Sequence, residues 1–150
     1  MKHIVLVGDM KVGKKGDVIV TYALGTSLGL VAYDPKAQVG GLLHAMLPLS
    51  KSDPKKAAAN PFIFVDTGVP KLFEEIYNMG GDKSRLVVKA AGCSRPEGDN
   101  EMFKIGEKNY AVLKKILWKN NILLEGEEVG GTANRTVQFD VASGEIKVTS

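Results

Sequence analysis

Cysteine and histidine are scarce in this chain of 150 residues, in which Cys93 is the only cysteine and His3 and His44 are the only histidines. A single cysteine excludes an internal disulfide framework and is consistent with a reducing compartment, so we expect a cytoplasmic protein. The chain also contains neither an HExxH motif nor a CxxC motif. We therefore expect no metal site and no cofactor.

Long apolar runs and a strong excess of one charge are missing as well. No apolar run approaches the roughly 18 residues of a membrane-spanning helix, and the first residues become polar too early for a signal peptide, so we expect no membrane insertion. The net charge is only +3, and the lysines are scattered along the chain without interleaved aromatic residues. This pattern argues against a nucleic-acid partner, and an anionic protein partner fits the charge at least as well.

The order of the predicted elements indicates an α+β fold. With 44% hydrophobic and 25% charged residues, the composition is typical of a soluble globular protein, and the length fits one domain over residues 1–150. Apolar, β-branched runs predict strands over residues 4–7, 18–22, 28–33 and 39–47. A polar segment bounded by prolines, residues 48–61, follows them, and we interpret it as a mobile loop.

Two helices and several short strands are expected in the second half. Apolar residues at a period of 3.6 predict a helix capped by Asp66 or Thr67, with Pro70 in its first turn and a stop at Gly80. The same period predicts a second helix over residues 107–119. Strands are predicted over residues 85–91, 122–124, 135–141 and 145–148, and an irregular loop over residues 92–104.

Gly8, Gly13 and Lys14 have the spacing of a phosphate-binding P-loop, but their surroundings do not fit one. Lys15 stands where Ser or Thr would hold magnesium. The residues that follow have the pattern of a strand, whereas a P-loop continues into a helix. A glycine-rich β-turn is the better interpretation.

The segment from Thr21 to Gly29 is the most informative part of the chain. Gly25 and Gly29 bracket two small hydroxyl residues, Thr26 and Ser27. A tight turn of this kind presents a nucleophile and leaves backbone N–H groups free to face a developing oxyanion. His44 lies in the next predicted buried strand, from which its imidazole can reach the turn. Taken alone, it is more often a core histidine that bonds a backbone carbonyl.

Longer stretches of the sequence resemble one known family. They are Val20-Thr21-Tyr22-Ala23-Leu24-Gly25-Thr26-Ser27-Leu28-Gly29, Tyr33 to Pro48, Val65-Asp66-Thr67, Met102 to Asn109, Glu127 to Gly131 and Arg135-Thr136-Val137. In this order they resemble the chemoreceptor glutamine deamidases of chemotaxis, the CheD family. The resemblance implies a single α+β domain of layered mixed sheets with flanking helices.

The resemblance also implies a catalytic site. His44 falls where the family has its general base, Thr21 where it has the threonine that orients the base, and Ser27 where it has a catalytic cysteine. Gly25 and Thr26 then belong to the oxyanion turn. Cys93 stands where the family usually has glycine, and we expect it to be a packing residue. Thr132 replaces the asparagine usual after Gly131.

Ser27 changes the expected activity. In the family that the sequence resembles, a cysteine thiolate attacks the side-chain amide of a receptor glutamine, ammonia leaves, and water hydrolyses the thioester to glutamate. Serine remains a neutral hydroxyl at neutral pH, and the third group is a threonine rather than a carboxylate. We therefore expect little or no deamidase activity. Three explanations stay open: a natural serine in a non-catalytic module that binds chemoreceptors or a CheC-type phosphatase, a serine introduced in place of the cysteine, and a working serine amidohydrolase.

Overall fold

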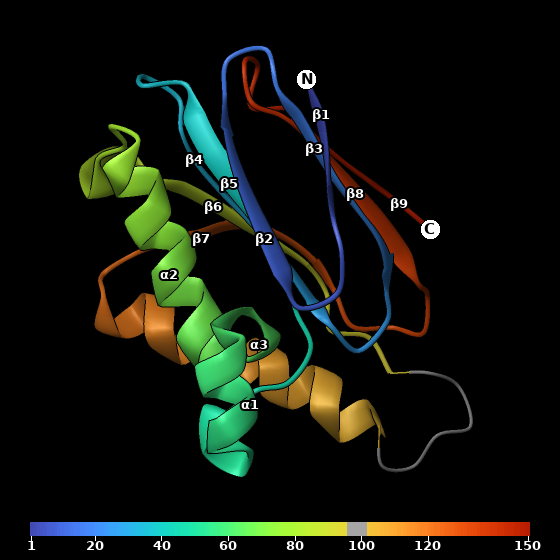
Figure 1. Cartoon of the computed structure of the whole chain (residues 1–150). Coiled ribbons are helices and arrows are strands. Elements are labelled where there is room, and N and C mark those ends of the chain that lie inside the picture. Colours follow the sequence, from blue (N-terminus) through green and yellow to red (C-terminus); the bar gives the residue numbers. More distant parts are fainter. Residues whose placement is uncertain (96–101) are drawn as a thin grey trace.

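The structure is a computed structural model that describes residues 1–95 and 102–150. Its strands form two mixed sheets that pack face to face (Figure 1). The first, sheet A, has the order β1-β3-β8-β9, in which β1 is Lys2–Val5, β3 Val18–Leu24, β8 Arg135–Asp140 and β9 Ile146–Thr149. Sheet B has the order β2-β5-β4-β6-β7, in which β2 is Asp9–Lys14, β5 Val39–Ala45, β4 Leu28–Asp34, β6 Val87–Gly92 and β7 Leu124–Val129.

Helices cover the face of sheet B that is turned away from sheet A (Figure 1). They are α1 (Pro54–Ala59), α2 (Val65–Asn78) and α3 (Met102–Lys119), with short 3-10 turns at Ser50–Ser52, Pro61–Ile63 and Lys83–Arg85. The order of layers is therefore helices, sheet B, sheet A, which confirms the predicted α+β class. Within the described residues, no helix is long and apolar enough to cross a membrane.

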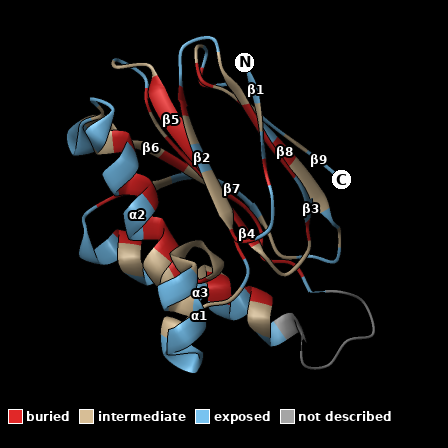
Figure 2. Cartoon of the chain, viewed as in Figure 1, coloured by how far each residue is buried: buried red, intermediate tan, exposed pale blue. Residues whose placement is uncertain are grey.

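Sheet B is covered on both faces, and strand β5, which lies between β2 and β4, is buried along its whole length (Figure 2). Side chains alternate between the two faces of a strand. Leu43 packs in the core between sheet B and the helices, whereas Leu42 packs in the core between the two sheets. His44 follows this alternation, so its side chain lies between the sheets.

Several predicted boundaries were wrong. Residues 9–14, which we interpreted as a turn, form strand β2, because they pair antiparallel with β5 from Asp9↔His44 to Lys14↔Val39. The predicted loop 48–61 contains helix α1, whose first turn is capped by the Asp53 side chain accepting from the Lys56 N–H at 3.1 Å.

The two long helices also begin earlier than predicted. Helix α2 starts at Val65, so Pro70 lies inside it, and the carboxylate of Asp66 accepts hydrogen bonds from Ser50 instead of capping the helix. Helix α3 starts at Met102, within the predicted loop 92–104, of which residues 96–101 lie outside the described residues. Strand β7 begins at Leu124, where the predicted strand 122–124 ends.

Candidate active site

His44 lies between the two sheets, near one end of the sandwich, and is held there by strands on both sides. Strand β5 pairs with β2 and with β4, and in these ladders His44 lies opposite Asp9 and Gly29. The imidazole is fully buried. Gly29 leaves space on the same face, and the side chain of Leu24 fills this space. A Cβ at position 29 would lie only 2.6 Å from that side chain. The ring is therefore fixed by regular secondary structure and not by a loop.

Thr21 fixes the tautomer of His44. The Thr21 hydroxyl lies 2.7 Å from the carbonyl oxygen of Val5 and 2.8 Å from His44 Nδ1. A carbonyl oxygen can only accept, so the single hydroxyl proton of Thr21 is donated to Val5. His44 Nδ1 must then be the protonated nitrogen that donates to Thr21 Oγ1. The other ring nitrogen, Nε2, carries the lone pair.

His44 Nε2 has no hydrogen-bond partner among the described residues, although it is buried. Burial lowers the pKa of His44 from 6.5 to about 4, so the ring is neutral at neutral pH. An unpaired acceptor in a protein interior costs free energy and calls for an explanation. A general base would provide this explanation, because its lone pair must be free to accept a proton.

The turn between β3 and β4 lies at the same end of the sandwich as His44. Its carbonyl groups are all engaged, because Gly25 O accepts from Ser94, Thr26 O from Asn109 Nδ2 at 2.9 Å, and Ser27 O from the Cys93 N–H at 2.8 Å. In contrast, the backbone N–H groups of Thr26 and Ser27 donate to no group in the described part of the chain. The turn thus directs its carbonyls into the protein and keeps two amide donors available.

Ser27 precedes β4 directly and is two residues from Gly29, the partner of His44 in the ladder. The side chain of Ser27 is half-buried. No hydrogen bond joins it to His44 Nε2. The structure brings Thr21 and His44 into contact and places Ser27 at the same end, without contact between the serine and the base.

Asn109, which the sequence did not single out, ties the turn to the histidine strand. Its Nδ2 group donates to Thr26 O at 2.9 Å and to the carbonyl of Met46, the residue after β5, at 3.2 Å. The side chain is fully buried, and its Oδ1 has no partner among the described residues. Asn109, Leu113 and Leu117 are spaced by four residues on α3. A polar residue within the buried stripe of a helix is the signal that could have revealed it.

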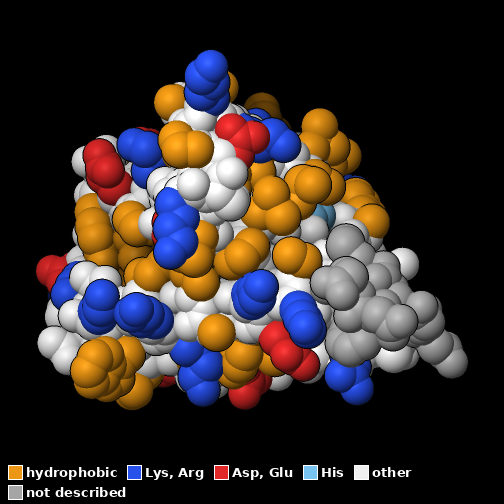
Figure 3. Space-filling view, turned by 90° about the horizontal axis from the view of Figure 1, so that it is seen from below, with side chains coloured by type: hydrophobic (Ala, Val, Ile, Leu, Met, Phe, Trp, Pro, Cys, Tyr) orange, Lys and Arg blue, Asp and Glu red, His pale blue; other side chains and the backbone are white. Residues whose placement is uncertain are grey.

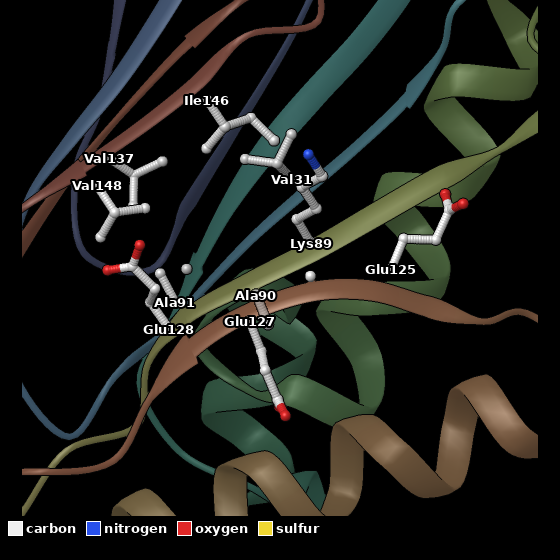
Figure 4. A pocket seen from close by; sticks show the side chains of 12 residues that line it. Val31, Lys89, Ala90, Ala91, Glu125, Glu127, Glu128, Val137, Ile146 and Val148 are labelled. Carbon is white, nitrogen blue, oxygen red and sulfur yellow. The ribbon is translucent and has the colours of Figure 1, made fainter.

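A cavity of about 210 Å³ also lies between the two sheets, but it does not include Thr21, Ser27 or His44. In Figure 4, Val137 and Val148 of sheet A lie across from Ala91 and Val31 of sheet B, and the side chain of Glu127 points away. The cavity is mainly apolar and brings together no nucleophile and base. Among residues 1–95 and 102–150, no three His, Cys, Asp or Glu side chains gather to hold a metal ion.

Comparison with known proteins gives the same family as the sequence pattern. Residues 46–150 match the family model of CheD chemotactic sensory transduction. The chain is 45% identical over 148 residues to the "Probable chemoreceptor glutamine deamidase CheD 1" of Syntrophus aciditrophicus, covering 98% of this chain and 92% of that protein. It is 49% identical over 144 residues to the corresponding protein of Solibacter usitatus, covering 95% and 85%. The chain belongs to the CheD family.

A third relative is less similar than these two. The "Probable chemoreceptor glutamine deamidase CheD" of Pyrococcus horikoshii is 39% identical over 144 residues, covering 95% of this chain and 88% of that protein. Each of these alignments extends over nearly the whole chain, whereas the CheD model begins at Met46, after Thr21, Ser27 and His44. The roles of these three residues in this chain therefore stay predictions.

Cys93 has the conformation and environment of a packing residue in this CheD protein. Its φ is 50°, in the left-handed region that favours glycine, and its side chain is buried. Burial raises the pKa of the Cys93 thiol to about 12, so it carries almost no thiolate at neutral pH. The preceding residue, Gly92, cannot carry a side chain, because a Cβ there would overlap the carbonyl oxygen of Ser27.

Proposed function

We propose that this chain is a chemotaxis protein with the site of a chemoreceptor glutamine deamidase, and that Ser27 leaves it with little or no activity. The observation that carries the proposal is the free lone pair of the buried His44 Nε2. It is supported by the names of the CheD relatives, which describe chemoreceptor glutamine deamidases. The single cysteine is unpaired and buried, which agrees with action in the cytoplasm.

His44 would act as the general base. Its Nδ1–H is held by Thr21, so the lone pair on Nε2 accepts the proton of the nucleophile at residue 27. That nucleophile attacks the side-chain amide carbon of a receptor glutamine. The proton taken by Nε2 then passes to the departing nitrogen, which leaves as ammonia, and water hydrolyses the acyl intermediate to glutamate.

The free N–H groups of Thr26 and Ser27 would stabilise the oxyanion. Backbone donors are effective in this role when they are fixed before the reaction. The turn is fixed from three sides, by Ser94, Cys93 and Asn109. Thr26 thus contributes a backbone donor, whereas Gly25 helps to hold the turn through its carbonyl, which accepts from Ser94.

Serine fits this site poorly. Its hydroxyl proton must pass to His44 during attack, which creates an imidazolium in a place where burial holds the pKa at about 4. In serine triads a carboxylate stabilises that cation. Here the third group is the Thr21 hydroxyl, whose proton is already donated to Val5. A cysteine avoids most of this cost, because its proton is lost far more readily.

The test is the intact mass of a chemoreceptor cytoplasmic fragment after incubation with the parent protein, Ser27→Cys or Ser27→Ala. Each deamidated glutamine adds about one dalton, and we expect this gain with Ser27→Cys alone. The double variant Ser27→Cys/His44→Gln is the matched control and should be inactive. Activity of the parent would establish a serine nucleophile, and silence of a folded Ser27→Cys protein would contradict the deamidase proposal.

A binding role without catalysis requires the surface of the site but no thiol. Such a module for chemoreceptors or for a CheC-type phosphatase is the alternative if Ser27→Cys is silent. Binding of the same receptor fragment by the parent and by Ser27→Ala with equal affinity would support it.

A further inference from the structure

Exposed apolar side chains adjoin the Thr21–Val5 hydrogen bond. Leu6 follows Val5 in the chain and is 67% exposed, and Tyr22 follows Thr21 and is 46% exposed. Strands β1 and β3 run parallel, with Val5 opposite Thr21, so Leu6 and Tyr22 are neighbours where the ladder ends. Two large apolar side chains therefore meet solvent directly beside the partner of His44.

Two more exposed apolar side chains adjoin His44 itself. Val7 precedes Gly8, whose N–H donates to the carbonyl of His44 at 2.8 Å, and Met46 lies two residues after His44. We call the following set the apolar rim: Leu6, Val7, Tyr22 and Met46. Exposed apolar side chains are ordinary when isolated, but a group of them around one site is typical of an interaction surface.

Helix α3 presents a stripe of lysines beside this rim. Successive residues turn by about 100° around a helix, so Lys104, Lys108, Lys115 and Lys119 fall within about 60° of arc and extend along about 22 Å. The four side chains are exposed, and within the described residues none forms an ion pair. Lysines that are scattered in the sequence are thus gathered by the helix, and we call this set the lysine stripe.

The lysine stripe is not compensated within its own helix. Glu107 is the only acidic residue of α3, and it pairs with Arg95. Like charges four residues apart, as in Lys104 and Lys108, slightly destabilise a helix. The indole of Trp118, 79% exposed, borders the stripe. Tryptophan is among the residues that most often carry the binding energy of a protein interface.

Both surfaces lie at the same end of the molecule. The Asn109 side chain of α3 contacts Thr26 and Met46, so the first turns of the helix adjoin the rim. The connections after β1, β3 and β5 reach this end as well (Figure 1). Figure 3 looks onto it and shows more Lys and Arg than Asp and Glu side chains, with hydrophobic side chains beside them.

We propose that this end docks an acidic amphipathic helix, whose apolar side contacts the apolar rim and whose carboxylates lie along the lysine stripe. This inference rests on the proposed function, because the docked helix would be the part of the chemoreceptor that carries the glutamine. Charge complementarity selects an acidic partner, and the length of the stripe suits about four helical turns.

The test measures binding of a tryptophan-free receptor cytoplasmic fragment through the fluorescence of Trp118, the only tryptophan of the chain. One variant changes the rim (Leu6→Ser/Tyr22→Ser/Met46→Ser), and another reverses the stripe (Lys104→Glu/Lys108→Glu/Lys115→Glu). Controls change exposed residues away from the rim and the stripe, Met79→Ser and Lys36→Glu/Lys83→Glu. We expect at least tenfold weaker binding for the rim and stripe variants and unchanged binding for the controls.

The stripe variant should also lose the salt dependence of binding. Parent-like affinity of the rim or stripe variant would overturn the proposal, as would equal weakening by the controls. A stripe variant that loses only binding to a DNA or RNA duplex would assign the lysines to nucleic acid instead. If Ser27→Cys still deamidates the receptor fragment after the rim and stripe changes are added, the docking proposal is contradicted and the proposed function stands. If Ser27→Cys is inactive while binding still depends on the rim, the proposed function is contradicted and the docking proposal stands.

Discussion

Asp34 and His44 are both fully buried and lie on neighbouring strands of sheet B, yet their surroundings are opposite. The Asp34 carboxylate accepts hydrogen bonds from two amides of its own hairpin, from the Asp82 N–H at 2.9 Å and from Arg85 Nε at 3.0 Å, and it pairs with a second Arg85 nitrogen at 2.8 Å. His44 has one side-chain hydrogen bond and a free lone pair. A buried polar group with every partner present stabilises the fold, whereas one left unpaired marks a place for chemistry.

Removing each side chain should separate the two roles most clearly. Asp34→Ala leaves buried amides without an acceptor, so we expect a loss of about 4 kcal/mol in the free energy of unfolding. His44→Leu removes an unpaired acceptor, and we expect a change within about 1 kcal/mol. Urea unfolding at pH 7 measures both. A large loss for His44→Leu would mean that the imidazole is structural.

The pH dependence of stability should show two separate windows. The pKa of His44 is about 4 in the folded chain and about 6.5 when unfolded, so the unfolded state takes up the proton first. The contribution of the neutral His44 to the free energy of unfolding is fully present above pH 6.5, and we expect it to fall by about 3 kcal/mol as the pH drops to 4. Burial raises the pKa of Asp34, but Arg85 and the amide donors outweigh it, so this pKa is held well below 3.8 and its contribution is lost only below that pH.

Urea unfolding between pH 3 and 8 checks these windows, with His44→Leu as the reference. This variant should lack the decline between pH 6.5 and 4 and keep the decline at lower pH. Identical profiles for the parent and the variant would show that another group titrates.

Asn109 has one unpaired atom, as His44 has, but its amide also donates to two carbonyls. In Ser27→Cys/Asn109→Leu we expect a loss of about 2 kcal/mol in the free energy of unfolding relative to Ser27→Cys, because these carbonyls lose a donor, and at least tenfold slower deamidation, because Thr26 is no longer tied to Met46. Asn120→Leu is the control, since Asn120 is exposed, follows the same helix directly, and its side chain donates to the carbonyl of Ile116 in the last turn. Loss of stability without loss of rate would make Asn109 a structural residue.

The smallest effect is expected at Cys93. Its thiol should stay unreactive toward a thiol reagent at pH 8 in the native parent protein and react only after unfolding, because its pKa is about 12. Ser27→Cys should then show one reactive thiol. Rapid labelling of the parent would contradict the packing role of Cys93.

The histidine strand could be predicted because its residues are continuously apolar. Strand β2 could not, since Asp9 to Lys14 contain a glycine and three charged residues, and only pairing with β5 makes them a strand. The predicted start of α2 was wrong for a similar reason. Asp66 is a residue type that often caps a helix, but its carboxylate accepts from Ser50, 16 residues earlier. Long-range contacts outweigh local preference in both cases.

The chemistry of the candidate site could be anticipated only in part. Thr21 and His44 were expected to meet, and the structure joins them at 2.8 Å. The backbone carbonyl of Val5 decides the tautomer of His44. A backbone group is present at every residue, so the sequence gives no indication of this contact. The contact of Asn109 with Thr26 spans 83 residues, so periodicity along α3 indicates its burial but not its partner.

The ladder between β4 and β5 starts at Leu28 and Ala45, one residue after Ser27. Residue 27 therefore lies just outside a rigid frame in which β3 and β5 hold Thr21 and His44. Exchanging its oxygen for sulfur leaves every strand pairing as it is. If residue 27 is the nucleophile, as we propose, a lineage could lose the activity and later recover it through one codon without any change to the fold.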